Sequence, residues 1–269
     1  MDEQRDVERI AQEDLLSQDI KSIAIGRNQQ LWIAQYGGGV SSLSLQDLAI
    51  TSEHSERDLQ RGQSISMIKD EVWLSTQNAG IQIYTPAKDQ WTQISERHGL
   101  SHNNIRAITT DHSDNIWIAS SGGGISKYLG QYFTHYTSAN GLNGNRIYAI
   151  SPTSDRGLML SVDTDGVSVI DSGGISTDID STYIETKCTD IYEDSSGRLW
   201  LSTAGGGLVM HDTSGYRRLN TENGLSSDWI RSVRQDGNGD LWVGTYADCL
   251  LYTSPSPRDR TRSRMPSSA

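Results

Sequence analysis

The chain has 269 residues, of which 35% are hydrophobic, and this is enough to build the core of one large domain or two small ones. Its formal net charge is -11, which argues against a nucleic-acid or anionic-membrane surface, because neutralising phosphate requires clustered Lys and Arg. With 26 Gly, seven Trp, eleven Tyr and a single Phe, the composition favours all-β repeats over long helices.

The first segment, residues 1–17, lacks the basic-then-apolar order of a secretory signal. The chain also has no run of about 20 apolar residues, the length that a membrane-spanning helix requires. We therefore expect neither a signal peptide nor a transmembrane segment in this sequence. Val7 and Ile10 fit the pattern of an outer strand. Residues 1–17 are therefore predicted to be the outer strand of a preceding repeat and a linker.

Residues 18–248 contain six copies of one repeat. Their anchor residues are Trp32, Trp73, Trp117, Met159, Trp200 and Trp242, spaced 41, 44, 42, 41 and 42 residues apart. This period is typical of four-stranded β-propeller blades. The sequence therefore predicts an all-β fold with six visible propeller blades. The last copy stops after its second strand, and we expect an incomplete ring.

Each copy begins with an apolar pair on its inner strand. The pairs are Ile20 and Ile23, Ile65 and Ile68, Ile105 and Ile108, Ile147 and Ile150, Cys188 and Ile191, and Ile230 and Val233. The second pair stands closer to its anchor than the others, which predicts a tighter turn around Lys69 and Asp70. Cys188 occupies an isoleucine position, so it is predicted to be a core thiol and not a reactive or metal-bound one.

The remaining parts of each copy predict a fixed strand order. An Asp/Gly turn follows the inner strand, the Trp strand comes next, and a glycine turn leads to a third and then an outer strand. A Gly-Leu loop, such as Gly224 and Leu225, leads into the next copy. The outer-strand residues Trp91, Phe133 and Tyr216 are expected to be at least half buried.

Antiparallel strands reverse at each turn, so the glycine turns and the Gly-Leu loops are predicted to share one face of the blades. Residues at this face differ from copy to copy, although the motif around them is repeated. This is expected of a binding surface on a rigid scaffold. The candidate ligand-binding residues are Tyr36, Asn78, Asn104, Arg146, Asp163, Trp229 and Tyr246. The three aromatic rings could stack on a small polar ligand such as a saccharide, and the four polar side chains could hydrogen-bond to it. The alternative is that these residues only fill the rim.

Motifs that could indicate a phosphate, metal or catalytic site have structural explanations. The glycine triplets that begin at Gly37, Gly122 and Gly205 precede strands, whereas a phosphate loop precedes a helix. Asp236, Asn238 and Asp240 alternate as in a calcium loop but lack its distal Glu, so capping of a turn is the favoured interpretation. No histidine has metal-ligand spacing, and no serine stands in a nucleophile elbow. We predict no metal, no cofactor and no catalytic residues.

The final segment, Cys249 to Ala269, changes composition abruptly to Ser, Pro and Arg. It resembles the translation of a transposase-type sequencing adapter, and we interpret it as a non-native, disordered tail. Without this segment the chain is more acidic, and Cys188 is its only cysteine.

Residues Gly224 to Thr245, GLSSDWIRSVRQDGNGDLWVGT, resemble the two-component regulator propeller repeat. The resemblance covers Ile20 to Asp248 and implies a periplasmic, ligand-binding sensor region. The parent of such a region is expected to be membrane-anchored and dimeric, with a histidine kinase or diguanylate cyclase output domain that is absent here. Two alternatives remain open: a streptogramin-lyase-like propeller enzyme, and a propeller scaffold that binds proteins.

Overall fold

The computed structural model describes residues 15–17, 19–26, 29–47, 49–154, 157–162, 166–179, 184, 186–237, 239–246 and 251–253. Over these residues the chain forms β-strands joined by turns and one-turn 3-10 helices, without an α-helix. Within the same residues, no helix is long and apolar enough to cross a membrane. The chain divides into two compact units, 1–108 and 109–269, and the division falls inside strand β9.

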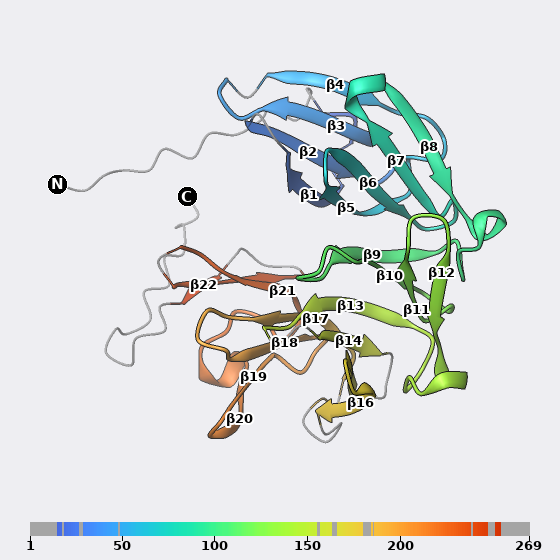
Figure 1. Cartoon of the computed structure of the whole chain (residues 1–269). Helices are drawn as coiled ribbons and strands as arrows, with labels where there is room; N and C mark the ends of the chain where they lie inside the picture. The colour runs from blue at the N-terminus through green and yellow to red at the C-terminus, as the bar shows by residue number, and fades with distance from the viewer. Residues whose placement is uncertain are drawn as a thin grey trace, which may run out of the picture. The chain divides into compact units, whose positions relative to one another are not determined.

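The first unit contains two complete blades, each a four-stranded antiparallel sheet in sequence order. The first blade is β1 (Ile20–Ile25), β2 (Gln30–Gln35), β3 (Gly39–Ser44) and β4 (Ile50–His54). The second is β5 (Gly62–Ile68), β6 (Glu71–Thr76), β7 (Ile81–Thr85) and β8 (Gln90–Ile94). Figure 1 shows the strands of each blade side by side.

Three further four-stranded sheets and one three-stranded sheet follow along the chain. The third blade is β9 (Ile105–Thr110), β10 (Ile116–Ser120), β11 (Ile125–Tyr128) and β12 (Phe133–Tyr136). The fourth is β13 (Ile147–Pro152), β14 (Leu158–Val162), β15 (Gly166–Asp171) and β16 (Gly174–Ile179). The fifth is β17 (Cys188–Glu193), β18 (Leu199–Thr203), β19 (Leu208–Asp212) and β20 (Gly215–Leu219). The sixth is β21 (Ile230–Gln235), β22 (Leu241–Thr245) and β23 (Leu251–Thr253). The all-β propeller fold predicted from the repeat is confirmed.

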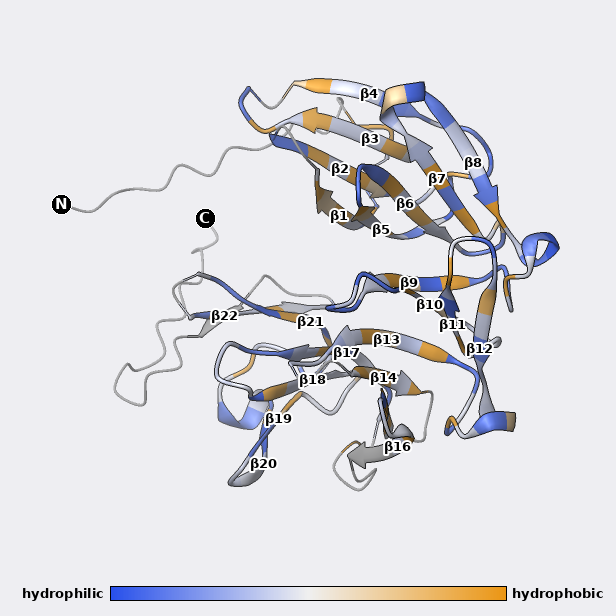
Figure 2. Ribbon diagram, in the orientation of Figure 1, coloured by the Kyte–Doolittle hydropathy of each residue, from blue (hydrophilic) through white to orange (hydrophobic). Residues whose placement is uncertain are grey.

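The second strand of a blade is mostly buried in the first five blades, and in two of them it is buried along its whole length. Every residue of β10 and of β18 is buried, without the alternation of a half-exposed strand. A strand is buried at consecutive residues when both faces of its sheet are covered. Figure 2 shows hydrophobic residues along β18, whereas the outer strand β20 is mostly hydrophilic.

Neighbouring blades bury their apolar faces against each other. In the first unit, Trp32 of β2 packs in one cluster with Ile65 of β5 and Leu74 of β6. In the second unit, Trp200 of β18 shares a cluster with Val233 of β21. Burial of such side chains is worth about 1.5–3 kcal/mol each, so contact between blades contributes to the stability of the fold.

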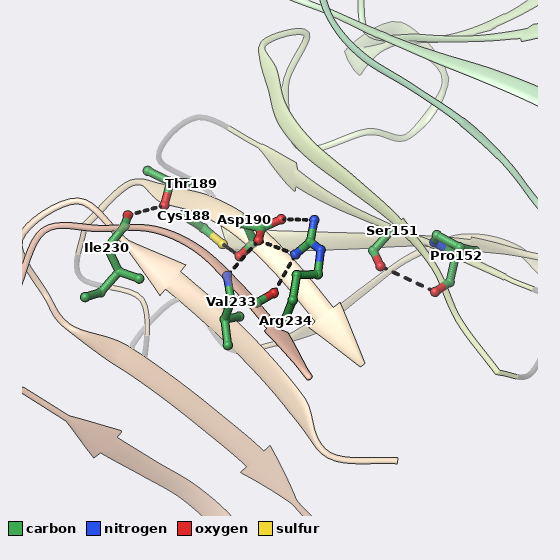
Figure 3. A network of polar contacts seen from close by, with 8 residues as sticks. All are labelled: Ser151, Pro152, Cys188, Thr189, Asp190, Ile230, Val233 and Arg234. Carbon is green, nitrogen blue, oxygen red and sulfur yellow. Dashed lines mark hydrogen bonds and ion pairs between the residues drawn. The ribbon is translucent and has the colours of Figure 1, made fainter. Parts of the chain in front are cut away.

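Polar contacts also join neighbouring inner strands, as Figure 3 shows for β17 and β21. The hydroxyl of Thr189 donates to the backbone oxygen of Ile230 at 2.7 Å, and the carboxylate of Asp190 accepts from the backbone nitrogen of Val233 at 3.1 Å. Asp190 also forms an ion pair with Arg234 at 2.5 Å. Burial raises the pKa of the Asp190 carboxyl and outweighs the opposing effect of the Arg234 charge. This aspartate therefore lies in the blade interface at some electrostatic cost.

Three local predictions are confirmed. Trp91, Phe133 and Tyr216 are each more than half buried. Lys69 turns the chain with a φ of 56° between the paired residues Ile68 and Glu71, which is the tight turn expected in the second blade. Cys188 is buried in a hydrophobic cluster, and this burial raises the pKa of its thiol to about 12.

The two ends of the described repeat differ from its middle. Ile20 and Ile23 are 45% and 58% exposed, whereas the corresponding Ile105 and Ile147 are fully buried, because an inner strand is covered only where another blade packs on it. Leu251–Thr253 forms β23, although no strand was expected after Cys249. The free edge of β22 offers backbone groups to any extended segment that follows, and these three residues pair with it. The other residues of 249–269 lie outside the described part of the chain, as do Val7 and Ile10.

Candidate functional site

The glycine turns and the Gly-Leu loops are joined directly by backbone hydrogen bonds. In the second unit, the amides of Gly205 and Gly207 both donate to the carbonyl oxygen of Asp228, at 3.0 and 2.9 Å. The amides of Gly122 and Gly124 donate in the same way to Asn145, at 3.0 and 2.8 Å. The two kinds of loop therefore form one continuous surface at each of these positions, as the strand order predicted.

Glycine is required where this surface turns sharply. Gly207 has a φ of 80°, a conformation that favours glycine, and a Cβ atom there would overlap the carbonyl oxygen of Leu219. Gly124 and Gly80 stand in the same relation to the oxygens of Tyr136 and Ile94. The glycine triplets thus serve close backbone packing, and each turn leads into a strand, as expected for a turn that is not a phosphate loop.

Trp229 and Tyr246 form an exposed aromatic pair on this surface. They are 57% and 65% exposed, and their ring centroids lie 6.5 Å apart at an interplanar angle of 54°. The backbone nitrogen of Tyr246 donates to the oxygen of Trp229 at 3.0 Å, which fixes the two residues side by side. The guanidinium carbon of Arg231 lies 4.4 Å from the centroid of Tyr246. Two aromatic faces and a cation are therefore presented to solvent together.

The backbone beneath Trp229 holds the ring in place. Trp229 forms an isolated antiparallel bridge with Ala204, at the start of the glycine turn. A Cβ atom at Gly205 would lie 3.5 Å from the indole, an ordinary contact distance, so the ring lies against the turn. Because the bridge fixes the backbone at Trp229, binding a ligand there costs little backbone entropy.

Arg146 occupies the position in its repeat that Trp229 occupies in its own. It forms a backbone bridge with Ser121, which precedes Gly122, and its side chain is exposed. Thus the same structural position displays an arginine in one blade and a tryptophan in another. Such variation on a constant frame is what a recognition surface requires.

The predicted site residues that the structure describes are divided between the two units. Tyr36, Asn78 and Asn104 belong to the first unit, where Lys21 lies 5.2 Å from the ring centroid of Tyr36. Asn104 is partly buried, and its Oδ1 has no hydrogen-bond partner among the described residues. Arg146, Trp229 and Tyr246 belong to the second unit, and the last two contact each other. Asp163 lies outside the described residues.

The calcium-like run has a structural role. Oδ1 of Asp236 accepts a hydrogen bond from the backbone nitrogen of Asp240 at 3.0 Å, and Oδ2 accepts from the indole of Trp242 at 3.0 Å. Both oxygens are thereby occupied within the turn, while Asn238 lies outside the described residues. The described residues contain no group of three His, Cys, Asp or Glu that could hold a metal ion.

Sequence reasoning missed two sets of residues. Arg231 follows the first apolar residue of its repeat and was treated as part of the inner strand, although its guanidinium reaches Tyr246. The turn between β4 and β5 was also missed, where Arg57 and Arg61 line a cavity. The available signal was the departure of that turn from the Gly-Leu pattern.

The repeat matches a known family in three segments, residues 99–122, 182–205 and 224–247, which correspond to the two component regulator propeller. These three segments are two-component regulator propeller repeats. The segments that begin at Gly99 and Gly224 start in Gly-Leu loops, and those that end at Gly122 and Gly205 stop in glycine turns, so the surface described above lies at these ends of the matched repeats. No curated protein matches the sequence.

Solved structures similar to these regulator propeller repeats share the fold at low sequence identity. The extracellular domain described for a one component system of B. thetaiotaomicron has a TM-score of 0.73 and 16% identity, covering 84% of this chain and 31% of that domain. The extracellular domain of a hybrid two component system of the same organism has a TM-score of 0.66 and 17% identity, covering 93% and 42%. Virginiamycin B lyase of Staphylococcus aureus has a TM-score of 0.70 and 19% identity, covering 89% and 86%. The chain thus spans less than half the length of both extracellular domains.

Proposed function

We propose that this chain is part of a ligand-sensing propeller in a bacterial signal-transduction receptor, and that it binds a small polar ligand such as a saccharide. The observation that carries the proposal is the exposed aromatic pair of Trp229 and Tyr246 on the surface made by the glycine turns and Gly-Leu loops. An exposed indole held by a rigid backbone is a suitable platform for the apolar face of a sugar ring. Arg231 and Arg146 supply hydrogen-bond donors at this surface.

The proposal includes a location and a parent. The similar extracellular domains support a periplasmic position for this propeller and a parent receptor that is membrane-anchored and dimeric. In such a receptor the propeller would not catalyse a reaction. Ligand binding would shift the parent receptor toward one of its conformations, and an output domain would convert that shift into a signal.

A streptogramin-lyase-like enzyme is the second candidate, because the chain covers 86% of the virginiamycin B lyase structure. The regulator repeats favour the sensor, since all three matched segments belong to that family. Incubating the chain with a streptogramin and following the antibiotic by mass spectrometry separates the two candidates. A sensor leaves the antibiotic unchanged, and a lyase converts it.

Calorimetric titration of the chain against a panel of neutral oligosaccharides tests the sensor proposal. We expect one panel member to bind, and Trp229→Ala to weaken it by about tenfold to a hundredfold through loss of stacking. Tyr132→Ala is the matched control, because Tyr132 is 72% exposed but lies in the turn between β11 and β12, at the opposite end of the blade from the glycine turns. Equal affinity of both variants, or no binding by the panel, would contradict the proposal.

A further inference from the structure

The turn between β4 and β5 departs from the Gly-Leu loops of the other blades. In those loops Gly99, Gly141 and Gly224 adopt positive φ angles of 92°, 114° and 118° before a buried leucine. Here Leu59 is the buried leucine, at 2% exposure, but it follows Asp58, whose φ is not positive. The anchoring leucine is kept while the chain around it follows a different path.

This turn is held firmly by the backbone of the first unit. The amide of Gly37 donates to the oxygen of Gln60 at 2.7 Å, and the amide of Gln77 donates to the oxygen of Arg61 at 3.0 Å. Leu59 packs into the cluster between the first two blades. The side chains of Arg57 and Arg61 are exposed on either side of this anchor. A rigid turn that directs two arginines outward is a preorganised element.

The turn lines a cavity of about 420 Å³ together with Asn78 and Thr76. A second cavity of about 490 Å³ shares Asp58, Asn78 and Ala79 with it and adds Arg97 and Gln93. Each volume is within the range that holds one or two sugar-sized groups. Together the two cavities are bounded by three guanidinium groups, by the carboxylates of Asp58 and Glu96, and by amide side chains.

The three guanidinium groups lack a described ion-pair partner. None of Arg57, Arg61 and Arg97 forms an ion pair with a described carboxylate. Arg61 is positioned by Asn78, whose Oδ1 accepts its hydrogen bond at 2.8 Å while Nδ2 donates to the oxygen of Gln77 at 2.8 Å. The carboxylate of Glu96 is already engaged by the backbone nitrogen of Asn103 at 2.9 Å. The two cavities are lined by three arginines and by two carboxylates, Asp58 and Glu96, so their combined lining has a formal charge of +1 in a chain of net charge -11.

We infer that this arginine pocket, formed by Arg57, Arg61 and Arg97 with Asn78, binds the carboxylate of an acidic polar ligand, of which a uronic acid is the representative class. The planar guanidinium groups of Arg57 and Arg61 match the geometry of a carboxylate. Gln93 and Asn78 supply donors and acceptors for hydroxyl groups, and Asp58 supplies an acceptor. The inference adds a ligand class to the proposed function and uses residues of the first unit, separate from the aromatic pair.

The test compares oligogalacturonate with the neutral galactose oligomer of the same length, which lacks only the carboxylates. Calorimetry on the whole chain is expected to show binding of the acidic oligomer that is at least about tenfold tighter. Arg57→Ala and Arg61→Ala should each remove most of that preference, and raising the salt concentration should weaken it. Arg217→Ala is the matched control, because Arg217 is exposed on β20 in the second unit. Melting temperatures of the exposed-site variants should match the parent chain.

Equal affinity for acidic and neutral oligomers, or an acidic preference that survives both arginine variants, would overturn the arginine pocket. No binding of the acidic oligomer at millimolar concentration would overturn it as well. Trp229→Ala distinguishes this failure from failure of the proposed function. If the acidic preference fails in one of these ways, while binding of the neutral oligomer is lost in Trp229→Ala and unchanged in Arg57→Ala, the sensor proposal is supported and the arginine pocket is rejected.

Discussion

The carboxylate of Asp194 accepts a hydrogen bond from the indole nitrogen of Trp200 at 2.9 Å. The same relationship joins Asp111 to Trp117 at 2.8 Å. In both blades the aspartate also accepts from backbone nitrogens of its own turn, so one side chain shapes the turn and fixes the anchor of the following strand. This aspartate is part of the structure of the repeat, and its repetition does not indicate a metal site.

Replacing this aspartate should destabilise the fold, and the loss should be larger where the tryptophan that it accepts from is more deeply buried. Asp194→Ala leaves a buried indole nitrogen and two turn amides without an acceptor, and we expect a loss of about 2–4 kcal/mol in the free energy of unfolding. Asp236→Ala should cost less, because Trp242 is 36% exposed and water can replace the carboxylate. Urea denaturation followed by tryptophan fluorescence measures both values. A larger loss for Asp236→Ala would show that the hydrogen bond to the anchor is not the decisive contact.

The same aspartates predict how stability depends on pH. Burial alone would raise the pKa of the Asp194 carboxyl, but the hydrogen bonds from Trp200, Arg198 and Ser196 together lower it below its usual value of 3.8. The pKa of Asp111 is lowered in the same way. The folded state therefore binds fewer protons than the unfolded state. This contribution is fully present above about pH 4 and is lost as the pH falls through the folded-state pKa.

Urea midpoints measured across the acidic range test this dependence. Asp194→Asn should be less stable at neutral pH and should lose less stability on acidification than the parent chain. Asp190 acts with the opposite sign, because its raised pKa gives a contribution that is present at low pH and lost as the pH rises. Asp190→Asn therefore serves as the opposing control. Parallel acid curves for the parent and Asp194→Asn would contradict the assignment.

Sequence spacing was sufficient to predict the blade architecture because the anchors and apolar pairs recur at a fixed period. It also predicted the packed state of Cys188, since a position filled by isoleucine in other blades must be apolar. The hydrogen bond from Trp200 to Asp194 was missed, although the six-residue spacing recurs in three blades. The exposure of Ile20 could not be predicted, because burial of an inner strand depends on a neighbouring blade and not on its own residues.

The site was only partly predictable for a related reason. Strand order placed the glycine turns beside the Gly-Leu loops, and the hydrogen bonds from Gly205 and Gly207 to Asp228 confirm this. Which variable residues touch each other depends on side-chain direction, and the structure brings Trp229 and Tyr246 into contact. The turn holding Arg57 and Arg61 was overlooked because it lacks the repeated motif.

Two glycines provide a matched test of the backbone argument. Gly207→Ala places a methyl group against the oxygen of Leu219 in a positive-φ conformation, and we expect a loss of at least about 3 kcal/mol. Gly237 has no positive φ and nothing within 4 Å of a built Cβ, so Gly237→Ala should change stability by less than about 0.5 kcal/mol. Thermal and urea denaturation of both variants measures the difference. Similar effects from the two changes would show that the glycine turn adapts freely.

The central claim, ligand recognition on the surface of the glycine turns, is tested most directly by the indole resonances of the seven tryptophans. Trp229 is exposed on that surface, whereas Trp117 and Trp200 are buried and donate to Asp111 and Asp194. Titration of the ¹⁵N-tryptophan-labelled chain with a binding saccharide should shift the indole signal of Trp229, assigned through Trp229→Phe, and leave those of Trp117 and Trp200 in place. A saturable shift confined to other indoles, with Trp229 unmoved, would contradict recognition at this surface.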